Sequence, residues 1–427
     1  MSRLNKSTPD ILSTSGDWKS FRSKVKSTTP TILDTMGTGS SKQAGNQINP
    51  FRYGISKIEI RLLISFTPTL VMPRFEEVVL REWSLKKITR LLGLDSNNPP
   101  TIALNDALVT AARYSRKDIV LLLLDRVADI DMVVGGEYRT ALTAAACGGD
   151  TSIVSLLLHK GADINKVVEG KYGTALVAAA AGFCWSTNIV LLLLDGGANI
   201  NTVGGEYGTA LAAAAFYGRA NIVTLLLSRG ANINMVGGKY GTALAAAAFK
   251  SNMDMVSLLL GQKADTNLVV NKKCYGTALA VAALKGNMDM VSLLLGHKAK
   301  INLVGGEYGT ALAAAASESN MDIVSLLLGR GADINLQGEK YGTALAAAAY
   351  EGRLKVVSLL LDRGADINMV MDDGCGTALA AAAYMRQKDT VLLLLNRGAD
   401  INLVGGEYRT ALAAGISYES KDTVACY

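Results

Sequence analysis

The sequence predicts an all-α solenoid, in which short helix pairs are stacked and joined by hairpin-like loops. The string Gly205-Glu206-Tyr207-Gly208-Thr209-Ala210-Leu211 returns along the chain with small changes, at intervals of 33 to 35 residues. A second string, represented by residues 222–234, recurs between its copies. The tyrosine position of the first string is occupied by Tyr138, Tyr172, Tyr207, Tyr240, Tyr275, Tyr308, Tyr341, Cys375 and Tyr408. A period that persists over these positions indicates units that each contact only their neighbours, rather than one closed core.

Each unit is expected to contain two helices. Thr209 and its counterparts precede an alanine-rich run and should cap the first helix. That helix has only about eight residues, too few to be stable alone in water, so neighbouring units must hold it. The second helix carries the larger apolar side chains, and Gly331 and its counterparts should end it in the left-handed conformation. Lys263 and Lys298 replace this glycine, which predicts local softness near residues 262–300.

The two strings also carry a family resemblance. Thr209-Ala210-Leu211, Gly218, Ile222-Val223, Leu225-Leu226-Leu227 and Gly230-Ala231-Asn232-Ile233-Asn234 have the order and spacing of an ankyrin repeat, and the resemblance covers residues 104–427. The chain departs from the family pattern in three places. Alanines stand where the family has proline and histidine after the threonine, and Tyr207 stands where it has a turn glycine. In the first unit, Asp106 occupies the threonine position and is expected to start the helix.

Three regions are predicted along the chain. Residues 1–50 are rich in Ser, Thr, Gly, Asn and Lys and are expected to form a disordered basic arm. Residues 51–103 combine a strand-like alternation at 55–66 with an amphipathic helix at 74–93 that would cover the first repeat. The repeat array then spans 104–427, and its last unit is truncated. We expect an under-covered C-terminal face, which suggests self-association, a partner or an incomplete gene product.

Charge and composition restrict the classes of partner. The first 100 residues carry a net charge of +7 and the remainder carries −1, so nucleic acid is disfavoured as a partner of the array. No apolar run approaches the roughly 18 residues that a membrane span needs. Five cysteines without a CxxC pair are typical of a reducing compartment, so a cytoplasmic location is expected, with the nucleus as the alternative.

No residue pattern indicates catalysis, a cofactor or a small-molecule substrate. His159 and His297 are expected to be exposed residues at helix ends, too far apart to share a metal ion. Asp163, Asp333 and Asp366 recur once per unit and are interpreted as turn residues. The Gly-Gly pairs lack the strand and the Lys-Ser/Thr of a phosphate loop. The sequence therefore predicts a protein that is not an enzyme and binds no metal.

The resemblance implies that a partner docks on the concave face, formed by hairpin tips and by the ends of the first helices. The expected tip residues are Glu137, Lys171, Glu206, Lys239, Glu307 and Lys340. The expected aromatic contacts are Phe216, Tyr217, Phe249, Tyr350, Tyr384 and Tyr418, together with Phe183 and Trp185 in an insertion. Aromatic side chains in a row resemble interface anchors, but they could equally pack between units. The recurring tyrosines are assigned to hairpin packing.

The leading functional hypothesis is a non-catalytic scaffold that binds a protein or peptide. A second hypothesis is a sensor or autoinhibitory module of a larger effector or signalling protein, of which this chain would be a fragment. A third uses the basic residues of 1–100 to contact nucleic acid or anionic lipid. Little salt dependence of binding would count against it.

Overall fold

The structure is a computed structural model that describes residues 101–416, except 127, 183–186, 271–273, 339, 372–373, 375 and 408, and for 101–103 it describes only the backbone. All described residues belong to one compact unit, Val79–Tyr427. The predicted arm, the strand-like segment at 55–66 and the helix at 74–93 lie outside the described residues. Phe183, Trp185 and Tyr418 also lie outside them.

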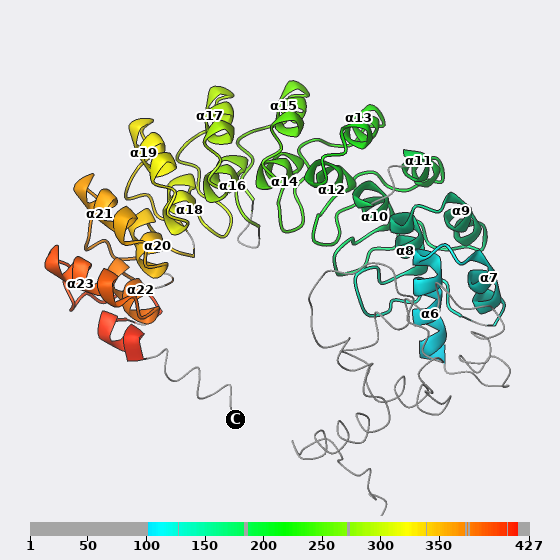
Figure 1. The fold of residues 1–427 in the computed structure, drawn as a ribbon, viewed down its shortest axis with the longest axis horizontal. Coiled ribbons are helices and arrows are strands. Elements are labelled where there is room, and N and C mark those ends of the chain that lie inside the picture. The colour runs from blue at the N-terminus through cyan, green and yellow to red at the C-terminus, as the bar shows by residue number, and fades with distance from the viewer. Residues whose placement is uncertain are drawn as a thin grey trace, which may run out of the picture. The chain divides into compact units, whose positions relative to one another are not determined.

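Helices alternate between two rows, as Figure 1 shows. The inner row contains α6 (Thr101–Arg113), α8 (Ala141–Gly148), α10 (Ala175–Ala181), α12 (Ala210–Phe216), α14 (Ala243–Phe249), α16 (Ala278–Leu284), α18 (Ala311–Ser317), α20 (Ala344–Tyr350) and α22 (Ala378–Tyr384). The outer row contains α7 (Lys117–Asp125), α9 (Thr151–His159), α11 (Thr187–Asp195), α13 (Ala220–Ser228), α15 (Met253–Gly261), α17 (Met288–Gly296), α19 (Met321–Gly329), α21 (Leu354–Asp362) and α23 (Lys388–Asn396). The predicted all-α solenoid is confirmed.

Local capping explains where the inner helices begin. The Thr209 hydroxyl accepts a hydrogen bond from the Ala212 amide at 3.0 Å, and Thr242 does the same for Ala245 at 3.1 Å. The predicted role of the threonines is therefore confirmed. The prediction for Asp106 is wrong, because α6 begins at Thr101 and Asp106 lies inside it. Leu104 and Leu108 are four residues apart and both are buried, so a continuous helix buries one face across the position of Asp106.

Alanine makes the inner row tightly packed. In α12, every residue from Ala210 to Phe216 is buried, and α12 lies against both α10 and α14. A helix with such small side chains can approach its two neighbours closely. The outer helices bury one face only, as α13 does with Ile222, Val223 and Leu226. The core is therefore a continuous layer between the two rows, and no repeat holds a core of its own.

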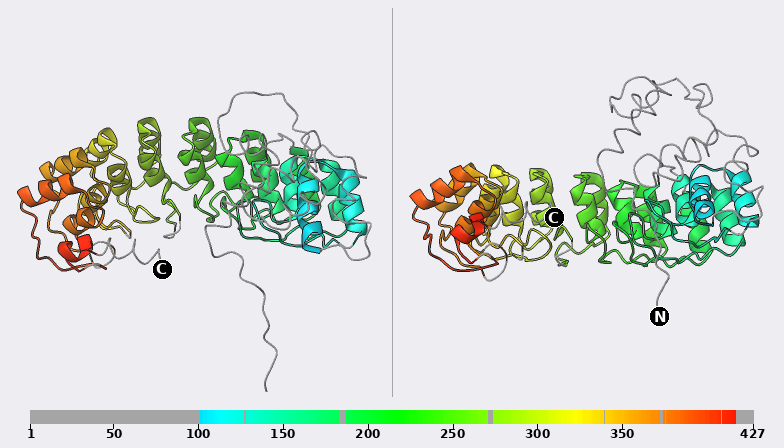
Figure 2. Two further views of the ribbon diagram at one scale, coloured as in Figure 1. Left: turned by 60° about the horizontal axis from the view of Figure 1, so that its bottom comes forward. Right: turned by 90° about the horizontal axis from the view of Figure 1, so that it is seen from below.

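Hairpin-like loops connect each outer helix to the next inner helix and gather along one edge of the array (Figure 2). Most of these loops are closed by a backbone hydrogen bond, such as that from the Gly204 amide to the Gly208 carbonyl at 2.7 Å. Adjacent loops are also joined, since the Lys239 amide donates to the Glu206 carbonyl at 2.7 Å. No strand longer than an isolated bridge occurs in the described ranges.

A side-chain relay runs through the turns that follow the outer helices. The Asn232 side chain accepts from the Asn234 amide at 3.0 Å, and the Asn234 side chain accepts from the Asp265 amide of the next repeat at 2.9 Å. The same two steps repeat at Asp333, Asn335 and Asp366. The interpretation of the recurring aspartates as turn residues is confirmed, and the relay adds a bond from each turn to the next.

Candidate protein-interaction surface

A ladder of tyrosine rings runs along the hairpins. The centroids of consecutive rings lie 5.5 Å apart for Tyr138 and Tyr172, 6.0 Å for Tyr172 and Tyr207, and 5.9 Å for Tyr207 and Tyr240. Tyr275 continues the ladder 5.7 Å from Tyr240. These separations are in the range that aromatic pairs prefer. The assignment of the tyrosines to hairpin packing is confirmed.

Burial disfavours ionisation of several ladder tyrosines. Desolvation raises the pKa values of Tyr172, Tyr207 and Tyr240 well above that of free tyrosine. It also raises the pKa of Tyr308 to about 12. The thiol of Cys147 is buried, and burial raises its pKa as well, so it is a poor nucleophile at neutral pH.

The aromatic residues at the ends of the inner helices pack against this ladder. The ring of Phe216 lies 5.1 Å from that of Tyr207 and 4.6 Å from that of Tyr240. Phe216 is only 9% exposed, so the expectation that it is an exposed anchor is wrong. Its position between two tyrosines, which the one-dimensional pattern does not reveal, buries it. Tyr217, by contrast, is half-buried and its hydroxyl is 2.6 Å from that of Tyr207.

The other predicted aromatic contacts are also partly used within the array. Phe249 is half-buried and lies 5.0 Å from Tyr240. Tyr350 and Tyr384 are half-buried too, and their rings lie 6.2 Å apart. Each therefore offers a partner only a part of its ring surface. Packing between units and binding at the remaining surface are compatible for these three residues.

The charged hairpin tips form ion pairs between neighbouring repeats. The Lys171 ammonium lies 2.9 Å from the Glu137 carboxylate, and the Lys239 ammonium lies 4.0 Å from that of Glu206. Lys340 pairs with Glu307 in the same way. Such exposed pairs contribute roughly 0–1 kcal/mol each. The tips predicted as partner contacts thus neutralise one another in pairs, which the sequence shows only as a mixture of signs.

Lysines also lie over the aromatic rings. The Lys250 ammonium is 4.6 Å from the centre of the Phe216 ring, and that of Lys285 is 4.7 Å from the centre of Phe249. At these distances a cation is attracted to the ring face. The lysines that follow α14 and α16 therefore border the ladder with positive charge.

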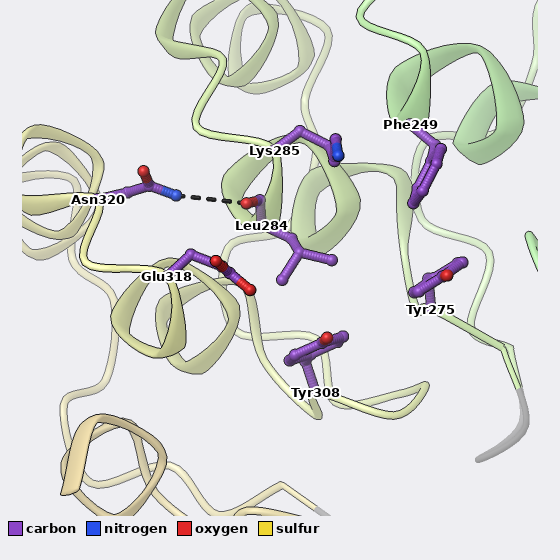
Figure 3. A pocket seen from close by; sticks show the side chains of 7 residues that line it. All are labelled: Phe249, Tyr275, Leu284, Lys285, Tyr308, Glu318 and Asn320. Carbon is purple, nitrogen blue, oxygen red and sulfur yellow. Dashed lines mark hydrogen bonds between the residues drawn. The ribbon is translucent and has the colours of Figure 1, made fainter. Parts of the chain in front are cut away.

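A cavity of about 430 Å³ opens beside the ladder between α14, α16 and α18. It is lined by Phe249, Tyr275, Leu284, Lys285, Tyr308, Glu318 and Asn320 (Figure 3). Its volume is within the range of small ligand sites. Within the described ranges, no group of three or more His, Cys, Asp and Glu side chains is placed to hold a metal ion.

Comparison with known proteins identifies the repeats. A family model described as ankyrin repeats (3 copies) matches residues 84–168, 166–237, 243–338 and 312–405. The chain belongs to the ankyrin repeat family. Among solved structures, the human ASB11 ankyrin repeat domain is 26% identical, with a TM-score of 0.40 over 53% of this chain and 98% of that chain. A search of curated proteins gave no match. The ankyrin fold is generally a non-catalytic interaction module.

One surface feature of the ankyrin array was missed in the sequence. An exposed valine lies in the loop of most repeats, shortly before the position of the ladder tyrosine, which Cys375 occupies in one of them: Val167, Val203, Val236, Val269, Val370 and Val404. The signal was a valine that recurs four to six residues before the tyrosine position of the first string. Val203 also lies beneath Gly237 of the next loop, where an added Cβ would come within 2.4 Å of it. The valines therefore both space adjacent loops and leave an apolar edge in water.

The ankyrin array places the two histidines as predicted. His159 ends α9, His297 follows α17, and both are exposed. Among the described helices, none is long and apolar enough to cross a bilayer.

Proposed function

We propose that this ankyrin protein is a non-catalytic scaffold that binds a polypeptide partner along the ends of its inner helices and its hairpin tips. One observation carries the proposal. The alanine helices, capping threonines and ladder tyrosines repeat because each satisfies a neighbour, whereas the residue at the end of the inner helix is not the same in every repeat. These residues are Phe249, Leu284, Ser317, Tyr350 and Tyr384, whereas Phe216 at the end of α12 is buried and is not part of the proposed surface.

The residues that follow these helix ends support the same surface. Lys250 and Lys285 are exposed, and so is Glu318. Variation at exposed positions on a fixed scaffold is how a repeat protein tunes one surface without disturbing its packing. Half-buried aromatic rings beside exposed charges provide both apolar contact and orientation for a partner.

The test uses charge reversal on the two rows. The double variant Lys250→Glu with Lys285→Glu should lose most of its captured partners in affinity mass spectrometry from native cells, because it reverses charge beside the proposed surface. The matched control, Asp254→Lys with Asp289→Lys, changes exposed first-turn residues of the outer helices α15 and α17. A control that loses the partners while the inner-row variant retains them would contradict the proposal.

A second candidate function is self-association through the last described repeat. Leu412 is 69% exposed, whereas the leucines at the same position in earlier repeats, such as Leu211 and Leu379, are 2–3% exposed. An exposed leucine at a position that the fold otherwise buries suits an apolar contact with another chain. In sedimentation equilibrium, wild type should associate and Leu412→Glu should remain monomeric. Leu354→Glu, a 37% exposed residue at the start of α21, is the control. Equal association of all three chains would exclude this surface.

A further inference from the structure

Two helix-end aromatic residues, Phe216 and Phe249, each contact two consecutive ladder tyrosines. Phe216 lies 5.1 Å from Tyr207 and 4.6 Å from Tyr240, centroid to centroid. One repeat later, Phe249 lies 5.0 Å from Tyr240 and 4.9 Å from Tyr275. The array thus has a wedge position, defined here as the place at the end of an inner helix where a ring contacts two consecutive ladder tyrosines.

The next wedge position has no ring. Leu284 ends α16 at the place that Phe249 occupies in α14. Within the described part of the chain, Tyr275 has no ring contact with Tyr308, although the ladder resumes at Tyr308 and Tyr341 with a separation of 5.6 Å. The cavity of about 430 Å³ lies in this interruption, with both tyrosines and Leu284 in its lining.

A missing ring alone does not open a cavity. Ser317, in the following repeat, is smaller than Leu284, yet the tyrosines on either side of it, Tyr308 and Tyr341, are stacked directly. The space beside Leu284 therefore results from two features together, an aliphatic wedge residue and a separated pair of tyrosines. Figure 3 shows Leu284 and Glu318 on one side of the space and Phe249 and Tyr275 on the other.

We propose that this cavity binds an aromatic side chain of the partner polypeptide, tryptophan or tyrosine, which completes the ladder. The inference rests on the proposed scaffold function and names the chemistry of its partner. The chain's own Phe216 and Phe249 show that a ring at this position contacts two consecutive tyrosines, at centroid distances of 4.6 to 5.1 Å. Aromatic pairs are favourable at such distances.

The rim of the cavity favours a ring that carries a polar hydrogen. The Asn320 side chain already donates to the Ala283 carbonyl at 2.9 Å, so it holds α16 in place. The Lys285 ammonium lies over Phe249, at 4.7 Å from its ring centre. Glu318 is exposed and its carboxylate points into the space beside Tyr308 (Figure 3). A carboxylate there accepts from an indole N–H or a phenol O–H, which phenylalanine lacks.

The direct test uses N-acetyl-tryptophanamide as the probe and ring-labelled tyrosine in the full chain. In NMR titrations, the signals of Tyr275 and Tyr308 should shift and saturate, while those of Tyr138 and Tyr172 should not. Leu284→Phe places a ring of the chain itself at the wedge position and should weaken binding of the probe at least tenfold. Leu354→Phe, at an exposed site on α21, is the matched control and should leave the titration unchanged.

A second variant keeps the test valid if Leu284→Phe disturbs folding. Glu318→Gln changes an exposed side chain. It should weaken binding of N-acetyl-tryptophanamide several-fold and leave binding of N-acetyl-phenylalaninamide unchanged. Shifts spread evenly over the tyrosines, or equal binding by wild type and both variants, would overturn the inference. So would tighter binding of adenosine than of N-acetyl-tryptophanamide, since the cavity would then select another kind of ring.

The partner capture described above separates the two possible failures. Leu284→Phe should lose the same partners as the inner-row charge variant. If it retains all of them while the charge variant loses them, the scaffold function stands and the aromatic side chain in the cavity is refuted. If the charge variant also retains them, the proposed function itself fails, and the NMR titration still decides whether the cavity takes a ring.

Discussion

At the scale of the residue, the turn asparagines have two roles. Asn234 ends a turn that Asn232 closes, and its side chain also accepts the backbone amide of Asp265 in the next repeat. The second bond connects the turns of consecutive repeats. The short polar side chain explains the choice of residue, because Asn and Asp stabilise turns through bonds to nearby backbone.

Replacing Asn234 with alanine tests this connection. We expect Asn234→Ala to lower the free energy of unfolding by about 1 kcal/mol, the usual net contribution of one hydrogen bond. Urea unfolding followed by circular dichroism measures the change. Asn402→Ala is the control, since within the described residues no repeat turn follows Asn402 to use its side chain. Equal effects of the two substitutions would show that the hydrogen bond between repeats contributes nothing to stability.

At the scale of the element, the ends of the outer helices differ in backbone strain. Gly230 and Gly331 adopt φ values of 88° and 87°, whereas Lys263 and Lys298 adopt 64° and 62° at the same position. The left-handed conformation expected there is thus confirmed for both residue types. A side chain in this region is strained by roughly 1–2 kcal/mol relative to glycine. The predicted softness near residues 262–300 remains a prediction.

Exchanging the residue types tests this strain. Lys298→Gly should stabilise the array by roughly 1 kcal/mol, and Gly331→Lys should destabilise it by a similar amount. A Cβ at Gly331 would meet no atom within 4 Å, so the substitution adds backbone strain without a steric clash. Urea midpoints measure both variants, and hydrogen exchange of α17 reports the local effect. If both substitutions change stability in the same direction, the φ value does not determine the stability of these helix ends.

The loops provide a second comparison at this scale. A Cβ at Gly208 would lie 2.3 Å from the Gly237 carbonyl carbon, whereas one at Gly230 would meet nothing within 4 Å. Both glycines have positive φ. Gly208→Ala should therefore lower stability by more than about 3 kcal/mol, through a clash added to the conformational strain, and Gly230→Ala by roughly 1 kcal/mol. Thermal unfolding distinguishes them, and similar melting temperatures would mean that adjacent loops can separate freely.

At the scale of the whole array, periodic features were predictable and departures from periodicity were not. Threonine caps, turn aspartates and the left-handed glycines follow from local chemistry, so one copy of the repeat is enough to infer them. Phe216 and the cavity beside Leu284 depend on which ring lies against which neighbour, and residue spacing does not contain that information. The pairing of Glu137 with Lys171 required knowledge of how consecutive tips approach.

The desolvated tyrosines of the ladder make the array sensitive to alkaline pH. Burial raises the pKa of Tyr308 to about 12, above the value near 10 of an unfolded chain. A raised folded-state pKa gives stability that is fully present below about pH 10 and is lost as the pH rises through the folded-state value. Tyr172, Tyr207 and Tyr240 are shifted in the same direction. Helical circular dichroism should therefore fall above about pH 10, together with a rise in tyrosinate absorbance, and Tyr308→Phe should move this transition to higher pH. Tyrosinate absorbance that rises fully near pH 10 while helicity persists would show that the ladder rings are open to solvent.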